Sequence, residues 1–127
     1  MEITIPGLEA NADISAKQFE AVKLTGTTSD FRVSAIAATT DKPIGILMNE
    51  PNAAGEGATV AGPGSVTKAR YGGAVNVGDS LSVDADGELV AVVEGTDTTR
   101  YIIAIALEDG ADQEVHYVLV VSPHRAS

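Results

Sequence analysis

Three carboxylates alternate with other residues around one glycine: Asp84, Asp86 and Glu88 surround Gly87. Calcium prefers carboxylate oxygens, but an EF-hand spreads its ligands over a loop of about twelve residues between two helices. Here the group covers only residues 84–88 and lies between segments that alternate like strands. An Asp-Gly pair between two such segments is typical of a tight hairpin, because glycine readily adopts positive φ. We therefore expect a solvated hairpin turn and no metal site.

Ser80 is a candidate nucleophile within the sequence Gly78-Asp79-Ser80-Leu81, which spells a hydrolase signature. A serine nucleophile needs a histidine base within hydrogen-bond reach and an acid that orients that base. Hydrolases with this signature are larger α/β chains with Asp-x-x-His near the end, whereas Asp112 and His116 here lie four positions apart. Gly78 and Asp79 are more simply the turn before a strand. We expect no catalytic residues and no enzymatic activity, and a hydrolase centred on Ser80 is an alternative.

Two further patterns lack the residues that their chemistry requires. The glycines of residues 62–65 suggest a phosphate-binding loop, but such loops end in Gly-Lys-Ser/Thr at the start of a helix. Here Lys68 stands three residues after Ser65, within a strand-like segment. His116 and His124 are the only histidines, and no ligand pattern surrounds them, which favours structural or surface roles. We therefore expect no cofactor.

The charge balance excludes several classes of partner. The chain of 127 residues has 8 Lys and Arg against 18 Asp and Glu, a formal net charge of −10. Such a surface repels phosphate backbones and anionic membranes, so we expect no nucleic-acid and no membrane partner. Cysteine is absent, which removes disulfides and thiolate chemistry. The first residues include Glu2 and no basic segment, so we expect synthesis in the cytoplasm without a secretion signal.

The residue types favour strands over helices. Val and Ile together number 23 and Thr adds 11, and these β-branched side chains suit a pleated surface. Glycine-rich and acidic turns separate short apolar or alternating segments, and the run over residues 43–48 predicts a strand buried on both faces. Residues 13–22 are the one helix candidate of note, with a second short one near residues 53–54. The expected strands are residues 17–25, 31–36, 43–48, 58–61, 65–71, 80–84, 88–93, 100–107 and 114–121.

The predicted organisation is one domain between two peripheral segments. Residues 1–12 alternate apolar and polar side chains around Pro6 and Gly7, which predicts an extended N-terminal arm. We expect this arm to add a strand to a partner sheet, with Ile3, Ile5 and Leu8 contacting the partner. A frayed terminus or a short edge strand is the plainer alternative. Residues 13–121 form the β-rich domain, and residues 122–127 form a C-terminal tail.

The two halves of the chain resemble each other weakly. Residues 43–48 lead into a glycine-rich acidic turn, and residues 102–107 lead into the acidic turn of residues 108–112. A true repeat would give one barrel or sandwich built from two related β units, while chance likeness between β segments of simple composition is the alternative.

Most of the domain, from about residue 13 to 121, resembles the capsid cement, or head decoration, proteins of tailed bacteriophages. The resemblance rests on Gly72-Gly73-Ala74-Val75-Asn76-Val77-Gly78-Asp79-Ser80-Leu81, then Asp84-Ala85-Asp86-Gly87-Glu88-Leu89-Val90, then Ile103-Ala104-Ile105-Ala106-Leu107-Glu108. Ala104 stands where glycine is common in that family. The resemblance also includes Ile44-Gly45-Ile46 before an Ala/Gly/Glu-rich turn.

The resemblance implies a small, mainly β, single-domain barrel or sandwich, of β-tulip type, with short hairpins and little helix. It implies a homotrimer on the outer surface of a phage head, bound to the major capsid protein and stabilising the shell against internal pressure. On this resemblance, the expected partner of Ile3, Ile5 and Leu8 is the capsid protein or a neighbouring copy. The family has no catalytic residues to carry over. Alternatives are a ligand- or carbohydrate-binding β module and another virion component, such as a tail or fibre piece.

Overall fold

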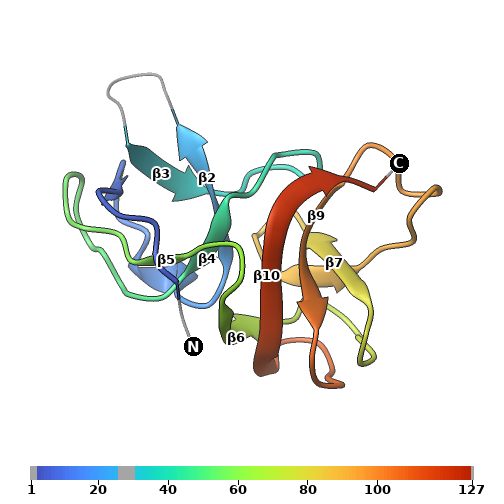
Figure 1. Cartoon of the computed structure of the whole chain (residues 1–127). Coiled ribbons are helices and arrows are strands. Elements are labelled where there is room, and N and C mark those ends of the chain that lie inside the picture. Colours follow the sequence, from blue (N-terminus) through green and yellow to red (C-terminus); the bar gives the residue numbers. More distant parts are fainter. Residues whose placement is uncertain (1–2, 26–30, 127) are drawn as a thin grey trace.

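The computed structural model describes residues 3–25 and 31–126, which form two five-stranded sheets joined as one small domain (Figure 1). Sheet A has the strand order β1-β3-β2-β4-β5, and sheet B has the order β6-β10-β9-β7-β8. The prediction of a mainly β single domain is confirmed. The strands are β1 (Glu9–Ala10), β2 (Ala21–Thr25), β3 (Arg32–Ala35), β4 (Gly45–Leu47), β5 (Val60–Ala61), β6 (Val66–Arg70), β7 (Ser80–Val83), β8 (Leu89–Ala91), β9 (Tyr101–Ala106) and β10 (Val115–Arg125).

Sheet A is built on the antiparallel pairs of β2 with β3 and with β4. All three residues of β4 are buried, as the continuous apolar run over residues 43–48 predicts. Gly45 is essential to this packing, because a Cβ there would collide with the carbonyl oxygen of Ala61 and the side chain of Val60 on β5. The small residue therefore sets how closely β5 approaches β4.

Sheet B is centred on β9 and β10, the two long strands that Figure 1 shows in orange and red. β7 and β8 form the predicted hairpin, in which Val83 pairs with Leu89 and Gly87 occupies the turn at φ +91°. The backbone of Ala21 donates to the carbonyl of Gly87 (2.8 Å), so the tip of this hairpin lies against the start of β2. The hairpin thus links sheet B to sheet A.

One apolar cluster spans both sheets. Ala21, Ile36 and Ile46 from sheet A and its loops pack in the same cluster as Leu81 and Ile103 from sheet B, and all five are buried. A second cluster lies within sheet A and includes Leu8, Val22, Val33 and Val60. Burial of β-branched and leucine side chains drives folding here. No helix in the described part of the chain is long and apolar enough to cross a membrane.

The helix predicted over residues 13–22 is wrong. A 3-10 turn, η1 (Ser15–Lys17), is followed by Phe19 at φ +69° and then by β2. Positive φ is incompatible with continuing a right-handed helix. A turn replaces the short helix considered near residues 53–54. The two halves of the chain each supply five strands, but the strand orders differ, so the weak internal repeat does not extend to topology.

The N-terminal segment is extended, as predicted, but it is folded onto its own chain. Residues 1–2 lie outside the described part. Thr4 bridges Ala61 in antiparallel fashion, and Glu9 of β1 pairs with Arg32 of β3 in parallel. Ala58 also donates its amide to the carbonyl of Leu8 (2.9 Å). The strand addition that the sequence suggested on a partner sheet occurs on sheet A of the same molecule.

The prediction of a C-terminal tail over residues 122–127 is wrong for residues 122–126. Residue 127 lies outside the described part of the chain. β10 continues to Arg125, which pairs with Tyr101, and the register between β10 and β9 shifts between Val120 and His124. Pro123 lies within this irregular stretch, where a residue without an amide hydrogen is tolerated. Ala126 is fully buried and donates its amide to Arg100 (2.9 Å). Proline therefore marks a bulge here and not the end of the strand.

Candidate functional site

The three carboxylates around Gly87 do come together. Single oxygens of Asp84, Asp86 and Glu88 lie within 4.8 Å of one another at the tip of the β7–β8 hairpin. Asp84 Oδ1 accepts hydrogen bonds from the amides of Asp86 (2.9 Å) and Glu88 (3.0 Å). This pattern is how an aspartate stabilises a tight turn. The geometry agrees with the hairpin turn expected from the sequence, and the expectation of no metal site stays a prediction.

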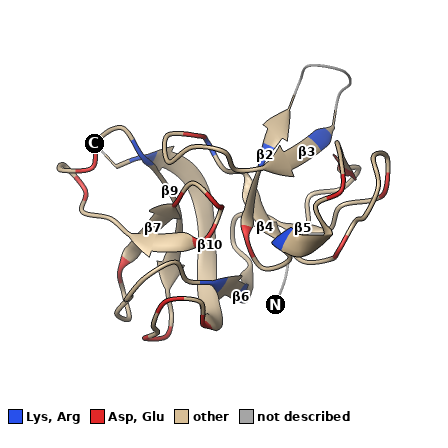
Figure 2. Cartoon of the chain, turned by 180° about the vertical axis from the view of Figure 1, so that it is seen from behind, with Lys and Arg blue, Asp and Glu red and all other residues tan. Residues whose placement is uncertain are grey.

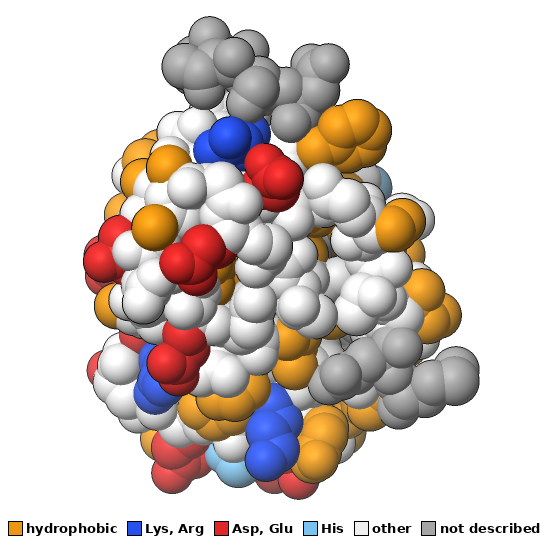
Figure 3. Space-filling model, turned by 90° about the vertical axis from the view of Figure 1, so that its left-hand side faces the viewer, with side chains coloured by type: hydrophobic (Ala, Val, Ile, Leu, Met, Phe, Trp, Pro, Cys, Tyr) orange, Lys and Arg blue, Asp and Glu red, His pale blue; other side chains and the backbone are white. Residues whose placement is uncertain are grey.

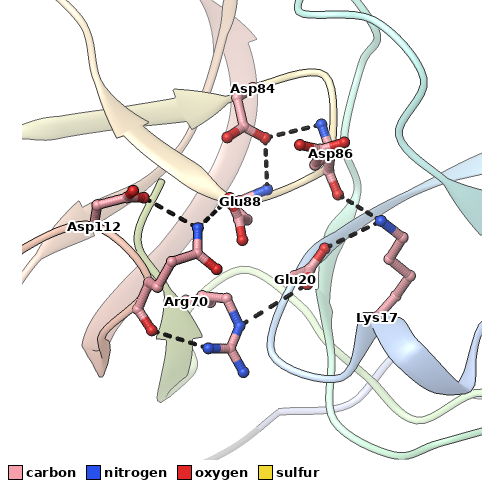
Figure 4. A network of polar contacts seen from close by, with 8 residues as sticks. Lys17, Glu20, Arg70, Asp84, Asp86, Glu88 and Asp112 are labelled. Atoms are coloured by element: carbon pink, nitrogen blue, oxygen red, sulfur yellow. Dashed lines mark hydrogen bonds and ion pairs between the residues drawn. The ribbon is translucent and has the colours of Figure 1, made fainter. Parts of the chain in front are cut away.

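Glu20 is the most buried carboxylate beside this turn, with 6% of its surface exposed. Figure 4 shows it between two cations from different elements: Lys17 Nζ lies 3.5 Å from Oε1, and Arg70 Nε lies 3.9 Å from Oε2. Burial raises the pKa of Glu20, Lys17 opposes this rise, and the negative charge of Glu88 adds to it. The two cations therefore stabilise the negative charge of Glu20 at the junction between the sheets.

Gln113 extends the network from the junction to the turn after β9. Arg70 Nη1 donates to the carbonyl of Gln113 (2.9 Å), and Gln113 Nε2 donates to Glu88 Oε1 (2.9 Å) and to Asp112 Oδ1 (3.0 Å) (Figure 4). Lys17 Nζ donates to the carbonyl of Asp86 (3.1 Å). These contacts join η1, β6, the β7–β8 hairpin and the β9–β10 turn, so the network holds elements of the two sheets together.

The candidate nucleophile Ser80 lies at the start of β7. Its hydroxyl lies 3.3 Å from Glu94 Oε1, at hydrogen-bond distance. His116 is on β10, where Nδ1 lies 3.3 Å from Glu108 and Nε2 lies 3.0 Å from Glu114. Both ring nitrogens thus face carboxylates, and the structure does not bring Ser80 and His116 together as a hydrolase would require. Gly78 and Asp79 instead form the turn that the sequence predicts before β7. The amide of Asn76 donates to Asp79 Oδ2, and the amide of Gly78 donates to the carbonyl of Ala106.

His116 has an electrostatic role at the start of β10. The hydrogen bond to Glu114 raises the pKa of His116, and the bond to Glu108 acts in the same direction. The pKa of Glu108 is lowered chiefly by the amide of Tyr117, and the pKa of Glu114 chiefly by His116. The ring also lies 5.3 Å from that of Tyr71. This group stabilises the turn between β9 and β10.

Tyr71 is fully buried, and its hydroxyl donates to the carbonyl of Glu108 (2.8 Å). Burial, reinforced by nearby carboxylates, raises the pKa of Tyr71 to about 12. This neutral, hydrogen-bonded phenol is a packing residue of the core. The sequence does not indicate that Tyr71 is buried, because its partner Glu108 lies 37 positions away.

Ser65 has a structural role in the segment whose glycines suggested a phosphate-binding loop. It is fully buried, accepts a hydrogen bond from the amide of Ile3 (2.6 Å) and donates one to the carbonyl of Ile3 (2.9 Å). Its hydroxyl therefore holds the N-terminal segment. No pattern in the sequence indicates this contact, because the two residues lie 62 positions apart.

The three residues expected to contact a partner fall into different environments. Leu8 is 5% exposed and belongs to the apolar cluster of sheet A, so the prediction of an external contact for Leu8 is wrong. Ile5 packs partly against the same cluster. Ile3 remains 47% exposed, and its contact with a partner stays a prediction. Figure 3, which views the sheet A side, shows charged side chains dispersed among apolar and uncharged ones.

No protein-family model matches the chain, and no curated protein matches it in sequence. Solved structures do match. One is the crystal structure of the N base of the head fibre protein gp8.5 of bacteriophage phi29, with a TM-score of 0.69 and 15% identity. The match covers 94% of this chain and 94% of that chain. It shows that the two chains share a fold across nearly their whole described length.

Proposed function

We propose that the chain is a structural protein of a bacteriophage particle, carried on the outer surface of the head. The observation that carries the proposal is the match to the phi29 head fibre base over 94% of both chains. Fold alone does not fix function, so a second line of support is needed. That support is the resemblance of residues 72–90 to phage cement proteins, and this segment forms the turn and hairpin of β7 and β8.

Within that role we favour a cement function, in which the chain binds the major capsid protein and stabilises the shell against internal pressure. Side chains that were candidates for chemistry are engaged in holding the fold, as Asp84 and His116 illustrate. Such a protein acts through its surface and needs no cofactor. The exposed Ile3 is the part of the predicted contact that remains available to a partner.

The experiment compares phage heads that carry the chain with heads from a deletion strain. Electron microscopy should show added density on the outer face of the shell only where the chain is present. DNA-filled heads without it should release DNA at lower temperature or on osmotic shock, and purified chain added back should restore resistance. Absence of the chain from purified particles would contradict the virion proposal.

The second candidate is a base module that holds a fibre on the head, favoured by the similarity of the chain to the N base of the phi29 head fibre. The same preparations separate the two. A fibre base should project from the head while the deletion leaves the resistance of the shell unchanged. A cement protein should change that resistance.

A further inference from the structure

The two long strands of sheet B have the sequence pattern of strands that are covered on both faces. Residues 101–107, in and after β9, and residues 115–121 of β10 are almost continuous apolar runs. Such runs are typical of strands buried on both sides, whereas a half-buried antiparallel strand alternates apolar and polar residues. One face is covered in the described structure, because Val118 and Val120 are buried in the apolar cluster that both sheets share.

The other face of these strands carries apolar side chains that remain in contact with solvent. Successive residues of a strand point to opposite sides, so Tyr117 and Leu119 face away from the shared cluster. Leu119 pairs with Val66 of β6 on one side and with Ile105 of β9 on the other. Tyr117 is 46% exposed, and the other three are partly exposed. None of the four belongs to an apolar cluster of the described residues.

A second row of side chains runs beside the first across the same three strands. Tyr117 pairs with Lys68 of β6, and the amide of Leu107 donates to the carbonyl of Tyr117 (3.2 Å). Leu107 is 42% exposed, and Lys68 is exposed with its Nζ 5.8 Å from the centre of the Tyr117 ring. We call the six residues of the two rows the outer face of sheet B: Val66, Lys68, Ile105, Leu107, Tyr117 and Leu119.

The strands that form the outer face carry no acidic residue, although the chain is strongly acidic. β6, β9 and β10 contain no Asp or Glu, whereas the chain has 18 of them. Figure 2 shows blue on β6 and red in the turns around sheet B. Within residues 3–25 and 31–126, Lys68 forms no ion pair with a carboxylate. An unpaired cation among apolar side chains is complementary to an apolar partner surface that carries a carboxylate.

Two acids border the outer face, and both are bound locally. Glu108 Oε1 accepts the amide of Tyr117 (2.8 Å) at the end of the face where β9 turns into β10. Glu94 Oε1 lies 3.3 Å from the hydroxyl of Ser80, which pairs with Ile105. These acids form a polar rim around an apolar centre, which is the usual composition of a protein interface.

We propose that the outer face of sheet B binds the major capsid protein, on an apolar surface that places a carboxylate opposite Lys68. The inference rests on the proposed function for the identity of the partner, while the position of the contact follows from the strands themselves. A second copy is a poor occupant, because two such faces bring a cation from each side and no carboxylate from either. Binding of the capsid protein gives β9 and β10 the cover on both faces that their apolar runs predict.

The test measures how tightly purified variants bind phage heads from the deletion strain, by co-sedimentation of the chain with the heads. Leu107→Gln removes apolar contact area, and Lys68→Glu sets a negative charge against the partner's carboxylate. Each variant should raise the dissociation constant about tenfold or more. Circular dichroism shows whether each variant is folded.

Leu24→Gln and Lys42→Glu are the matched controls. Leu24 is 56% exposed on β2, outside the outer face. Lys42 resembles Lys68, because it has no carboxylate partner in the described part of the chain and its Nζ lies 5.9 Å from the centre of a tyrosine ring, that of Tyr101. Both control variants should bind heads as tightly as the wild type.

The outcomes separate this inference from the proposed function. If the wild type binds heads and Leu107→Gln and Lys68→Glu bind equally well, the inference is refuted and the capsid-binding role stands. A wild-type chain that does not bind heads refutes that role and this inference together. A wild-type oligomer in sedimentation velocity that Leu107→Gln dissociates also refutes the inference, because a second copy then covers the face.

A footprint of the wild-type chain tests the same contact without any substitution. Oxidation of Leu107 and Tyr117 by hydroxyl radicals should fall when the chain is bound to heads, while oxidation of Leu24 stays unchanged. Equal oxidation of Leu107 and Tyr117 in the free and bound chain would overturn the proposal, even where a variant fails to fold.

Discussion

At the scale of residues, the polar side chains of this chain act mostly on its own backbone. Asp84 organises the hairpin turn, Ser65 holds the amide and carbonyl of Ile3, and Tyr71 binds the carbonyl of Glu108. The sequence placed Asp84 in this turn correctly, because an aspartate three residues before the turn glycine bonds to nearby backbone amides. It did not identify Ser65, because that partner is distant in the chain.

The His116 group gives stability a pH dependence. The pKa of His116 is raised above 6.5 in the folded protein, so its stabilising contribution is complete below that pH and disappears as pH rises through the raised value. Glu108 and Glu114 have pKa values lowered from 4.5, so their contribution is lost as pH falls below that value. The group therefore stabilises most between about pH 4.5 and 6.5.

We expect His116→Gln to reduce the fall in melting temperature between about pH 6 and about pH 8, measured by thermal denaturation. His124→Gln is the control, because His124 Nδ1 faces only the carbonyl of Ser122. That variant should keep the wild-type dependence. An unchanged pH profile in His116→Gln would show that the pairing with Glu114 and Glu108 does not form.

Gly45→Ala should destabilise the protein severely. A Cβ at this position collides with backbone oxygen of Ala61, which cannot move without breaking the pairing of β4 with β5. Overpacking of this kind costs about 1–3 kcal/mol or more. Gly57→Ala is the control, because nothing lies within 4 Å of a Cβ there, and we expect a change within about 0.5 kcal/mol. Urea denaturation of both variants measures the difference, and equal stabilities would refute the close approach.

At the scale of elements, the N-terminal segment is a structural strand with one exposed apolar residue. Leu8→Ala should lower the free energy of unfolding by about 2–5 kcal/mol, because Leu8 fills the apolar cluster of sheet A. Ile3→Ala should change it by less than about 0.5 kcal/mol but reduce binding to phage shells if Ile3 contacts the capsid protein. Denaturation and shell-binding assays on both variants separate the two roles. A harmless Leu8→Ala would indicate that the segment is not docked.

Strand positions follow from the sequence much better than strand neighbours. The alternation over residues 80–84 and the continuous run over residues 43–48 reflect local burial, and both gave the observed strands. Pairing depends on contacts between distant residues, such as Glu9 with Arg32, and periodicity contains no information on these. The C-terminal tail was predicted wrongly for a related reason, because a proline such as Pro123 occurs both at strand ends and at bulges.

At the scale of the whole molecule, the two sheets share one core and one charged junction. The apolar cluster that includes Ile46 and Ile103 spans both sheets, and Glu20 pairs with Arg70 across the junction. The sequence indicated one β domain, but the ion pair joins residues 50 positions apart and could not be predicted. A shared core makes independent unfolding of either sheet unfavourable, because it would expose apolar surface on the other.

Ile46→Ala therefore should weaken both sheets although Ile46 belongs to sheet A. We expect a loss of about 2–5 kcal/mol and an equal fall in hydrogen-exchange protection for amides of β2 and of β9. Leu24→Ala, at a position 56% exposed on β2, should leave both strands protected as in the wild type. Two sheets that fold separately would lose protection in β2 while β9 keeps it. That outcome would contradict the single cooperative unit, whereas parallel loss would show that the two sheets unfold together.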